Sequence, residues 1–363
     1  MDLVKITEGA TKLYVPDKNK YKLDSSMPVF FNDVMKLNRD ITVEILKKYF
    51  NKKKFKFLDL LSASGAKGIR ISNEIKTSEG VFNDANISAT KLIKKNAKLN
   101  GLNVTVFNNS ANKLLKSDKS MYDFIDIDPF GTPIEFLESS IVRLKKNGIL
   151  GVTATDTSAL VGTYPKACMR KYQSKNMRTF FMFEVAIRIL IKKVLDEANK
   201  QKISLIPIFS HSSNHYIRVY FKRVNYLNNY SDRICTLNYC TNCLNYKVTK
   251  KFSKSKRRCS CGSYFFQLGP MYSEEIYDKD FVKNLDDINK TILLIKKESQ
   301  INSFGYYDYH KIAKKIQKKE LSKIDDIIDN IIKKGYSASR THFSNTGIKT
   351  DMKIKSFMNI LKR

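Results

Sequence analysis

The stretch that decides the fold is FLDLLSASGAKGIR, residues 57–70. It opens as an apolar run of the kind found in buried strands and continues, after a turn of small residues, with helical apolar spacing. Small residues at a strand-to-helix turn let the backbone approach a ligand, and the N-terminus of the helix offers unpaired N–H groups. The stretch therefore predicts an α/β fold with a ligand site at this turn.

The same alternation of strands and helices continues from Phe55 to about Val224. Near-continuous apolar runs separated by helical stretches are typical of a parallel sheet covered on both faces. Only the loop SHSSNH separates the last two runs, so that pair must be antiparallel. The expected fold is the Rossmann-like, seven-stranded sheet of class I methyltransferases, ending in an antiparallel hairpin. Its candidate strands are residues 55–61, 80–84, 104–108, 122–128, 148–155, 203–209 and 216–222.

The composition changes after Val224, where a polar linker leads into a cysteine-rich stretch and a polar, helical last third. A length of 363 residues also favours two domains. We expect a methyltransferase domain over residues 1–224, including an N-terminal segment with VFFNDVMKLNRD, and a smaller α+β domain over residues 225–363.

The charge balance points to a polyanionic partner. Lys and Arg number 66 against 35 Asp and Glu, a formal net charge of +31. A codon bias toward AT-rich sequence raises the lysine content but does not remove acidic residues, so we expect a nucleic acid as partner. No run of about 18 or more apolar residues lacks charges, and the N-terminus shows no signal-peptide pattern. These features predict a cytoplasmic protein with no membrane association and no evident obligatory protein partner.

The turn after the first strand favours an adenosine cofactor. With one glycine at the tight turn instead of G-x-G-x-x-G, it suits S-adenosylmethionine better than a dinucleotide. Asp84 follows at the end of the second strand, where a carboxylate can accept hydrogen bonds from both ribose hydroxyls. Small-residue turns are common on their own, so the prediction depends on the combination with Asp84 and the strand order.

The motif DIDPFGTP, residues 126–133, ends the fourth strand, where the active site of an open α/β sheet is expected. An exocyclic amine of a base is a poor nucleophile because its lone pair is delocalised into the ring. The carboxylate of Asp128 can orient such an amine and take its proton, while Phe130 can stack on a flipped base. The alternative is a buried aspartate that caps the next helix.

The cysteine spacing predicts a structural zinc site. Two close pairs are separated by fifteen residues, and four thiolates brought together by two tight turns make a tetrahedral site. Without a secretory signal, metal is favoured over disulfides. An unmetallated set of thiols is the alternative, because the second pair is CxC where CxxC is commoner. The expected ligands are Cys240, Cys243, Cys259 and Cys261; Cys235 is out of register and Cys168 is expected to be packed.

The last part of the chain reads helix, turn, helix, strand, which suggests a winged-helix-like nucleic-acid module. An ordinary helical hairpin packed on the catalytic domain is the alternative. The side chains that could reach phosphates from this module are Arg340, Thr341, His342, Lys349 and Thr350.

Eight motifs in order give the chain a specific resemblance over nearly its whole length. It resembles the tRNA (guanine-26-N2)-dimethyltransferase family in its compact archaeal-type form. The resemblance implies S-adenosylmethionine-dependent methylation of a tRNA guanine amine, once or twice. The motifs are VFFNDVMKLNRD, FLDLLSASGAKGIR, NDAN, DIDPFGTPIEFL, GILGVTATDTSALVG, YPKACMRKY, FQLGPMY and ASRTHFSNTGIKTD.

The resemblance also implies residue roles. Arg39 and Arg70 would help hold the cofactor, Asp84 would bind its ribose, and Ser110 and Ala111 would line its adenine. The family more often has an acidic residue where this sequence has Ser110. The resemblance further assigns the catalytic carboxylate and the aromatic rings that flank the guanine, namely Asp128, Phe130 and Phe30. The winged-helix-like interpretation, for its part, makes Arg340 a candidate contact of tRNA.

Two rival functions remain open. Another base methyltransferase, acting on rRNA guanine N2 or DNA adenine N6, would share the Asp-Pro-aromatic motif and the cofactor turn. A non-catalytic RNA-binding protein with a methyltransferase-like fold is the second; Asp84 and Asp128 argue against it. The sequence leaves open the number of methyl groups added, whether neighbouring guanines are modified, the oligomeric state and the tRNA preference.

Overall fold

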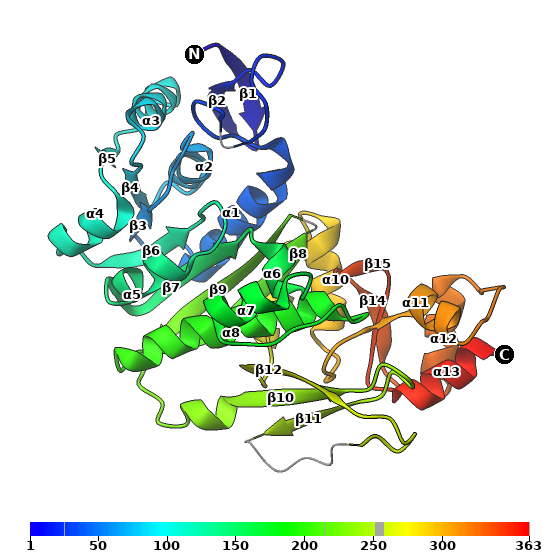
Figure 1. The fold of residues 1–363 in the computed structure, drawn as a ribbon. Coiled ribbons are helices and arrows are strands. Elements are labelled where there is room, and N and C mark those ends of the chain that lie inside the picture. Colours follow the sequence, from blue (N-terminus) through cyan, green and yellow to red (C-terminus); the bar gives the residue numbers. More distant parts are fainter. Residues whose placement is uncertain (25, 214, 251–257, 363) are drawn as a thin grey trace. The chain divides into compact units, whose positions relative to one another are not determined.

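The structure, a computed structural model, describes residues 1–24, 26–213, 215–250 and 258–362 (Figure 1). The chain forms two compact units. The N-terminal unit comprises Met1–Thr153, Gln201–Ile206 and Tyr220–Asn225, and the C-terminal unit comprises Ala154–Lys200, Pro207–Val219 and Tyr226–Arg363. The expected domain boundary near residue 224 stays a prediction.

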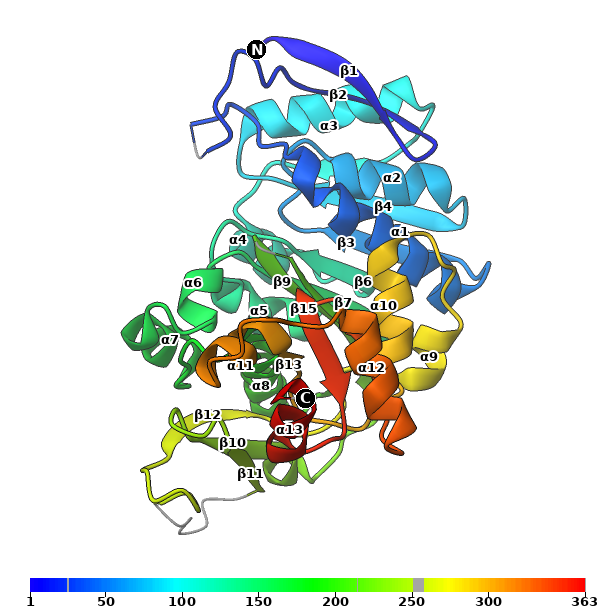
Figure 2. The same ribbon diagram turned by 90° about the vertical axis from the view of Figure 1, so that its right-hand side faces the viewer.

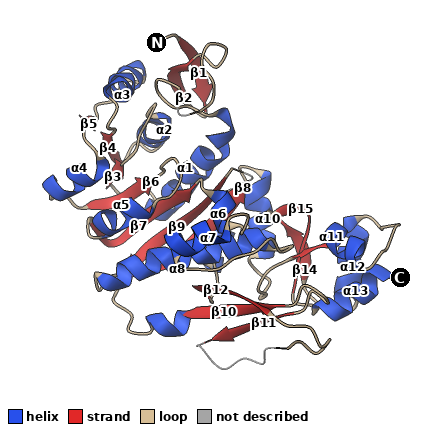
Figure 3. Ribbon diagram, in the orientation of Figure 1, coloured by secondary structure: helices blue, strands red, loops and turns tan. Residues whose placement is uncertain are grey.

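The expected seven-stranded sheet is confirmed, with strand order β5-β4-β3-β6-β7-β9-β8 (Figure 3). The strands from β3 to β7 pair in parallel. The consecutive strands β8 and β9 are neighbours at the end of the sheet, which makes the last pair a hairpin. The strands are β3 (Phe55–Asp59), β4 (Ser78–Asn83), β5 (Thr105–Phe107), β6 (Tyr122–Ile127), β7 (Leu144–Ala154), β8 (Ser204–Ser213) and β9 (Tyr216–Val224).

Strand β8 is longer than its apolar run predicts. The polar residues 210–213 look like loop in the sequence, yet they continue the strand. Ser210 is fully buried and its hydroxyl donates to the carbonyl of Ile276 at 3.2 Å. Its polar group is therefore satisfied inside the protein, which a hydropathy pattern does not reveal.

Five helices of the N-terminal unit follow or precede these strands. Figure 2 shows the first three on one side of the sheet, where α1 contacts α2 and α2 contacts α3. The helices are α1 (Lys36–Phe50), α2 (Ala66–Glu74), α3 (Ile87–Leu99), α4 (Ala111–Ser117) and α5 (Ile134–Ile141), and the short turn η1 (Asp33–Met35) precedes α1.

The N-terminal unit also contains an antiparallel hairpin that the sequence analysis left unassigned. It consists of β1 (Leu3–Glu8) and β2 (Thr11–Pro16). Asn96 of α3 fastens β2, because it accepts from the Tyr14 N–H at 2.7 Å and donates to the Tyr14 carbonyl at 3.0 Å.

The C-terminal unit has an α+β architecture. Two three-stranded antiparallel sheets, ordered β11-β10-β12 and β13-β15-β14, lie among its helices. The strands are β10 (Ile234–Tyr239), β11 (Tyr246–Lys250), β12 (Phe266–Tyr272), β13 (Tyr307–Asp308), β14 (Ala338–Thr341) and β15 (Ser344–Thr350). The helices are α6 (Thr157–Leu160), α7 (Pro165–Tyr172), α8 (Met182–Lys200), η2 (Tyr230–Arg233), α9 (Lys279–Lys283), α10 (Lys290–Glu298), α11 (Tyr309–Lys315), α12 (Ile324–Lys333) and α13 (Ile354–Lys362).

The element order α11, α12, β14, β15 agrees with the helix–helix–strand pattern expected for this region, since β14 and β15 form the hairpin that follows two helices. Among the helices of the described residues, none is long and apolar enough to span a membrane.

Candidate functional site

The turn between β3 and α2 is shaped by two glycines. Gly65 lies in the left-handed region at φ +75° and caps α2. Gly68 allows α2 to lie close to the sheet, because a Cβ there would be 2.8 Å from Oδ2 of Asp59. The N–H of Gly68 donates to the same oxygen at 3.1 Å. Gly68 therefore serves a close approach of helix to strand, whereas the predicted approach of the backbone to a ligand stays a prediction.

Asp84 lies beside this turn, directly after β4. Its Oδ2 accepts from the N–H of Ala63 at 2.8 Å, and its Oδ1 accepts from the N–H of Asn86 at 2.8 Å. Each carboxylate oxygen can accept more than one hydrogen bond. Because Asp84 is half-buried, its carboxylate can also receive the two hydroxyls of a ribose.

Ser110 and Ala111 lie where β5 leads into α4, at the same edge of the sheet. Asn83 links the loops of this edge by donating to the carbonyls of Leu60 at 3.1 Å and Asn109 at 3.0 Å. Ser110 is exposed and Ala111 is buried. The carboxyl ends of β3, β4 and β5 thus bring together three of the predicted cofactor positions, in the place where open α/β sheets bind ligands.

Arg39 and Arg70 are buried in a network of ion pairs. Arg39 donates to both carboxylate oxygens of Glu8, at 2.8 and 2.6 Å. Arg70 donates to Asp40 at 2.5 Å and to Glu74 at 2.8 Å. Their contact with a cofactor stays a prediction, and the structure shows that both guanidiniums also tie α1, α2 and the β1–β2 hairpin together.

Asp128 follows β6 and takes part in a charged cluster that the sequence analysis did not identify. The ammonium of Lys67, in the first turn of α2, lies 2.7 Å from Oδ2 of Asp126 and also contacts Oδ2 of Asp128. The side chains of Lys67 and Asp128 are 9% and 18% exposed. Asp59 lies opposite Asp126 in the pairing of β3 with β6.

The cluster perturbs the pKa of Asp59. Burial, together with the negative charges of Asp126 and Asp128, raises the pKa of Asp59 to about 7, although the Lys67 ammonium acts in the opposite direction. Strongly shifted carboxyl groups are concentrated at functional sites. The edge of the sheet near β6 therefore has the electrostatic character expected of an active site.

Phe30 and Phe130, the two aromatic residues expected to flank a base, lie together. Their ring centroids are 4.3 Å apart in an edge-to-face arrangement, and Phe130 is 62% exposed. An exposed phenylalanine beside a buried charged cluster provides stacking surface. A base held between the two rings requires them to separate.

The four predicted cysteine ligands are brought together. Their sulfur atoms all lie within 4.8 Å of one another, with Cys240 and Cys261 at 3.5 Å and Cys243 and Cys259 at 3.4 Å. A tetrahedron of thiolates around zinc, with Zn–S of about 2.3 Å, has sulfur–sulfur edges of about 3.8 Å. The cluster therefore fits a structural zinc ion, and the CxC pair takes part in it.

Hydrogen bonds favour the thiolate at one of these four cysteines. Bonds from the backbone and side chain of Ser263 lower the pKa of Cys261 to about 6, which favours the thiolate that binds metal. Cys235 and Cys168 are buried outside the cluster.

The residues expected to reach phosphates from the last hairpin differ in exposure. Arg340 is partly exposed and pairs with Asp325 at 2.7 Å. Thr341 and His342 are bound to the buried Glu298, and Lys349 is buried against Glu184 at 2.8 Å. Of these residues, Arg340 has the exposure to contact a phosphate, whereas Lys349 serves the interior of the C-terminal unit.

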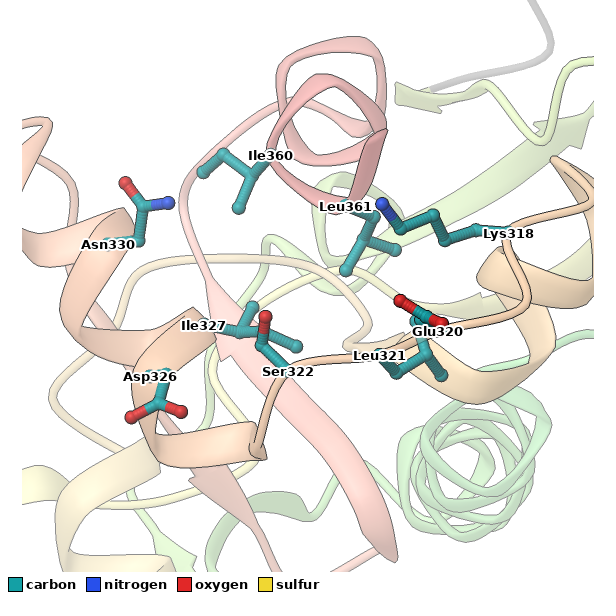
Figure 4. A pocket seen from close by; sticks show the side chains of 9 residues that line it. All are labelled: Lys318, Glu320, Leu321, Ser322, Asp326, Ile327, Asn330, Ile360 and Leu361. Atoms are coloured by element: carbon teal, nitrogen blue, oxygen red, sulfur yellow. The ribbon is translucent and has the colours of Figure 1, made fainter. Parts of the chain in front are cut away.

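A pocket of about 330 Å³ lies in the C-terminal unit between α12, α13 and the segment before α12 (Figure 4). It contains none of the predicted site residues. Its lining mixes charged and apolar side chains: Lys318, Glu320, Leu321, Ser322, Asp326, Ile327, Asn330, Ile360 and Leu361.

Known proteins resemble the chain over its full length. Residues 9–362 match the family model described as N2,N2-dimethylguanosine tRNA methyltransferase. A tRNA (guanine(26)-N(2))-dimethyltransferase of Methanosphaera stadtmanae is 38% identical, covering 99% of this chain and 97% of its own length. A tRNA (guanine(26)-N(2)/guanine(27)-N(2))-dimethyltransferase of Aquifex aeolicus is 36% identical, with 99% and 95% covered.

A solved structure is also similar to the chain over nearly its whole length. Trm1 from Pyrococcus horikoshii, determined with S-adenosyl-L-methionine, superposes with a TM-score of 0.86 at 29% identity and covers 99% of this chain and 100% of its own. The chain belongs to the N2,N2-dimethylguanosine tRNA methyltransferase family.

Proposed function

We propose that the chain transfers one or two methyl groups from S-adenosylmethionine to the exocyclic N2 amine of guanine 26 in tRNA. The observation that carries this proposal is the carboxylate of Asp128, held after β6 beside the exposed ring of Phe130. Full-length relatives that bear the name of this activity support the choice of base and position. We also propose a cytoplasmic location, which tRNA as the substrate supports.

The cofactor would lie along the carboxyl ends of β3, β4 and β5. We propose that Asp84 binds its ribose and that Ser110 and Ala111 line its adenine. Arg39 and Arg70, through their buried ion pairs, would support this side of the cofactor site. S-adenosylmethionine supplies there a methyl group that its positive sulfur makes electrophilic. Asp84 fits the role because its carboxylate is half-buried at the edge of the sheet.

The guanine would lie against Phe30 and Phe130, which hold it by stacking. Asp128 would accept a hydrogen bond from the N2 amine, so that the nitrogen lone pair is directed at the incoming methyl group. It then takes the proton that the amine loses. Because the cation formed when an aryl amine accepts a methyl group is acidic, a carboxylate is a sufficient base.

The C-terminal unit would serve tRNA binding. We propose that zinc on the four cysteines fixes the turns that flank β10 and β12, and that Arg340 contacts a phosphate. The surplus of basic residues supports a binding mode dominated by phosphates.

The decisive experiment is to incubate the protein with methyl-labelled S-adenosylmethionine and unmodified tRNA, and to identify the labelled nucleoside and its position. We expect N2-methylguanosine and N2,N2-dimethylguanosine at position 26, and loss of the label from a transcript with adenine at that position. A transcript with adenine at position 27 is the matched control and should keep its label. Label on adenine, or on no guanine N2, would contradict the proposal.

A further inference from the structure

Three carboxyl groups converge on one ammonium at the ends of two neighbouring strands. Asp59 ends β3 and is the register partner of Asp126 in β6, and Asp128 follows two residues later. Lys67 reaches them from α2, with its ammonium 2.7 Å from Asp126 and also in contact with Asp128. The cluster thus joins the cofactor turn to the strand that carries the catalytic carboxylate.

The position of Lys67 is not explained by the stability of its helix. Lys67 is the second residue of α2, where the helix dipole disfavours a positive charge. Its side chain is 9% exposed, so its ammonium has also lost most contact with water. The carboxylates that it bridges are therefore the reason for a buried lysine at this place.

Crowded carboxyl groups tend to hold protons. Two carboxylates that share a site cannot both stay ionised unless a positive charge lies between them. The raised pKa of Asp59, about 7, shows the effect in this cluster, since burial and the charges of Asp126 and Asp128 outweigh the lysine there. Asp126 and Asp128 contact the Lys67 ammonium directly, so its positive charge lies next to their carboxyl groups.

We propose that Lys67 is a positioning residue for methyl transfer, which orients the Asp128 carboxylate and keeps it anionic, with Asp126 as its second anchor. The inference rests on the proposed function. In the reaction the N–C bond forms as the C–S bond of the donor breaks, and the sulfur keeps the electron pair. The amine proton passes to Asp128 and from there to water.

The test compares Lys67→Met, which removes the charge but keeps the length, with Lys67→Arg, which keeps the charge. Single-turnover methyl transfer to unmodified tRNA is measured between pH 5.5 and 9, with separate titrations of S-adenosylmethionine and tRNA. Among the described residues, the charged groups known to lie near Asp128 include Lys67 of α2, Asp126 of β6 and Asp59 of β3.

For Lys67→Met we expect the rate at neutral pH to fall about 10- to 100-fold. The acidic limb of its pH profile should move to higher pH by about one to two units, because a carboxylate that loses an adjacent ammonium binds a proton more readily. Lys67→Arg should keep most of the rate and the original profile. A merely structural role would lower the rate without moving the limb.

Lys145→Met is the matched control. Lys145 pairs with Asp123 at 2.9 Å, a lysine–aspartate pair on β6 and β7 that is 42% and 23% exposed, and its removal should leave the profile unchanged. If Lys67→Met does not fold, Lys67→Gln keeps hydrogen-bond donors without the charge and should show the same shift.

The outcomes separate the two proposals. A wild-type chain that labels no guanine N2 contradicts the proposed function. A wild-type chain that labels it, together with uncharged Lys67 variants whose acidic limb stays in place, contradicts the role of Lys67 alone.

Discussion

A largely buried cluster of charged side chains around Lys67 in the N-terminal unit and one around Glu184 in the C-terminal unit have opposite compositions. In the N-terminal unit Lys67 pairs with Asp126 and Asp128, and Asp59 lies within reach of their charges. In the C-terminal unit the single carboxylate of Glu184 is bound by Lys349 at 2.8 Å, Arg188 at 2.8 Å and the N–H of Gly305 at 2.9 Å.

The pKa values of Glu184 and Asp59 shift in opposite directions. Burial alone would raise the pKa of Glu184, but the charges of Lys349 and Arg188 outweigh it and lower the pKa to about 2. The pKa of Asp59 rises to about 7. A carboxylate that is surrounded by cations and hydrogen-bond donors stabilises the fold. A cluster with more carboxyl groups than cations retains groups that titrate near neutral pH, and proton transfer needs such groups.

The largest effect of a substitution in either cluster is expected at Asp128. If Asp128 orients the amine and accepts its proton, Asp128→Asn should lose about a hundred- to ten-thousand-fold in single-turnover rate, or about 3 to 5 kcal/mol of transition-state stabilisation. Binding of S-adenosylmethionine and tRNA should change little, since this group acts near the transition state.

Asp84→Asn is the control for this experiment and should weaken cofactor binding first. Near-normal methyl transfer by Asp128→Asn would remove the base role and leave the Asp-Pro-Phe motif as a positioning element.

Glu184→Gln tests the other cluster. It leaves Lys349 and Arg188 buried without their carboxylate, so we expect a loss of about 3 to 5 kcal/mol in the free energy of unfolding, measured by denaturant titration. Glu197→Gln, the same change on the same helix, has the exposed Lys200 beside the buried Lys193 as partners and should cost less. Equal losses for both variants would show that the network around Glu184 is not special.

The pH dependence of stability should have opposite signs in the two clusters. The folded state binds the proton of Asp59 more tightly than the unfolded chain does, so its contribution to stability falls as pH rises from about 4 to about 7. Glu184 contributes stability above about pH 4, which is lost as pH falls toward 2.

Asp59→Asn should therefore flatten the decline between pH 5 and pH 8 and stabilise the protein at pH 8, by a few kcal/mol at about 1.4 kcal/mol per pH unit. Unfolding free energies of wild type and variant at both pH values measure this. A slope unchanged by the substitution would contradict the raised pKa of Asp59.

The smallest effect on folding is expected for the exposed pair of Arg340 and Asp325. Arg340→Ala should leave the unfolding midpoint almost unchanged, because exposed ion pairs contribute little. It should weaken tRNA binding and reduce the slope of log affinity against log salt by about one, as expected for one phosphate contact. A loss of S-adenosylmethionine affinity of the same size would contradict a tRNA-binding role.

The sequence predicts the sheet, and the places of several candidate site residues on it, well. The turn at Gly65, the place of Asp84 and the place of Asp128 all follow from the period of the strands, because parallel strands end at one edge. The cysteine cluster follows in the same way from its spacing.

The role of Lys67 could not be predicted from the sequence, because a lysine on a helix is usually solvated and its partners lie 59 and 61 residues further along the chain. Its position between two glycines of a helix that must lie close to the sheet was the available signal. Lys349 was misjudged for the same reason, since a basic residue in a predicted nucleic-acid module looks like a phosphate ligand.

The ion pairs around Glu184 join residues that the ribosome makes at different times. The N-terminal unit is complete once Asn225 has been made, but Lys349 is made 165 residues after Glu184. At about 5 to 20 residues per second, that is a delay of roughly 8 to 33 s. During this interval Arg188 is present, while Lys349 has yet to be made. The buried pair of Glu184 and Lys349 can therefore form only after β15 has been made.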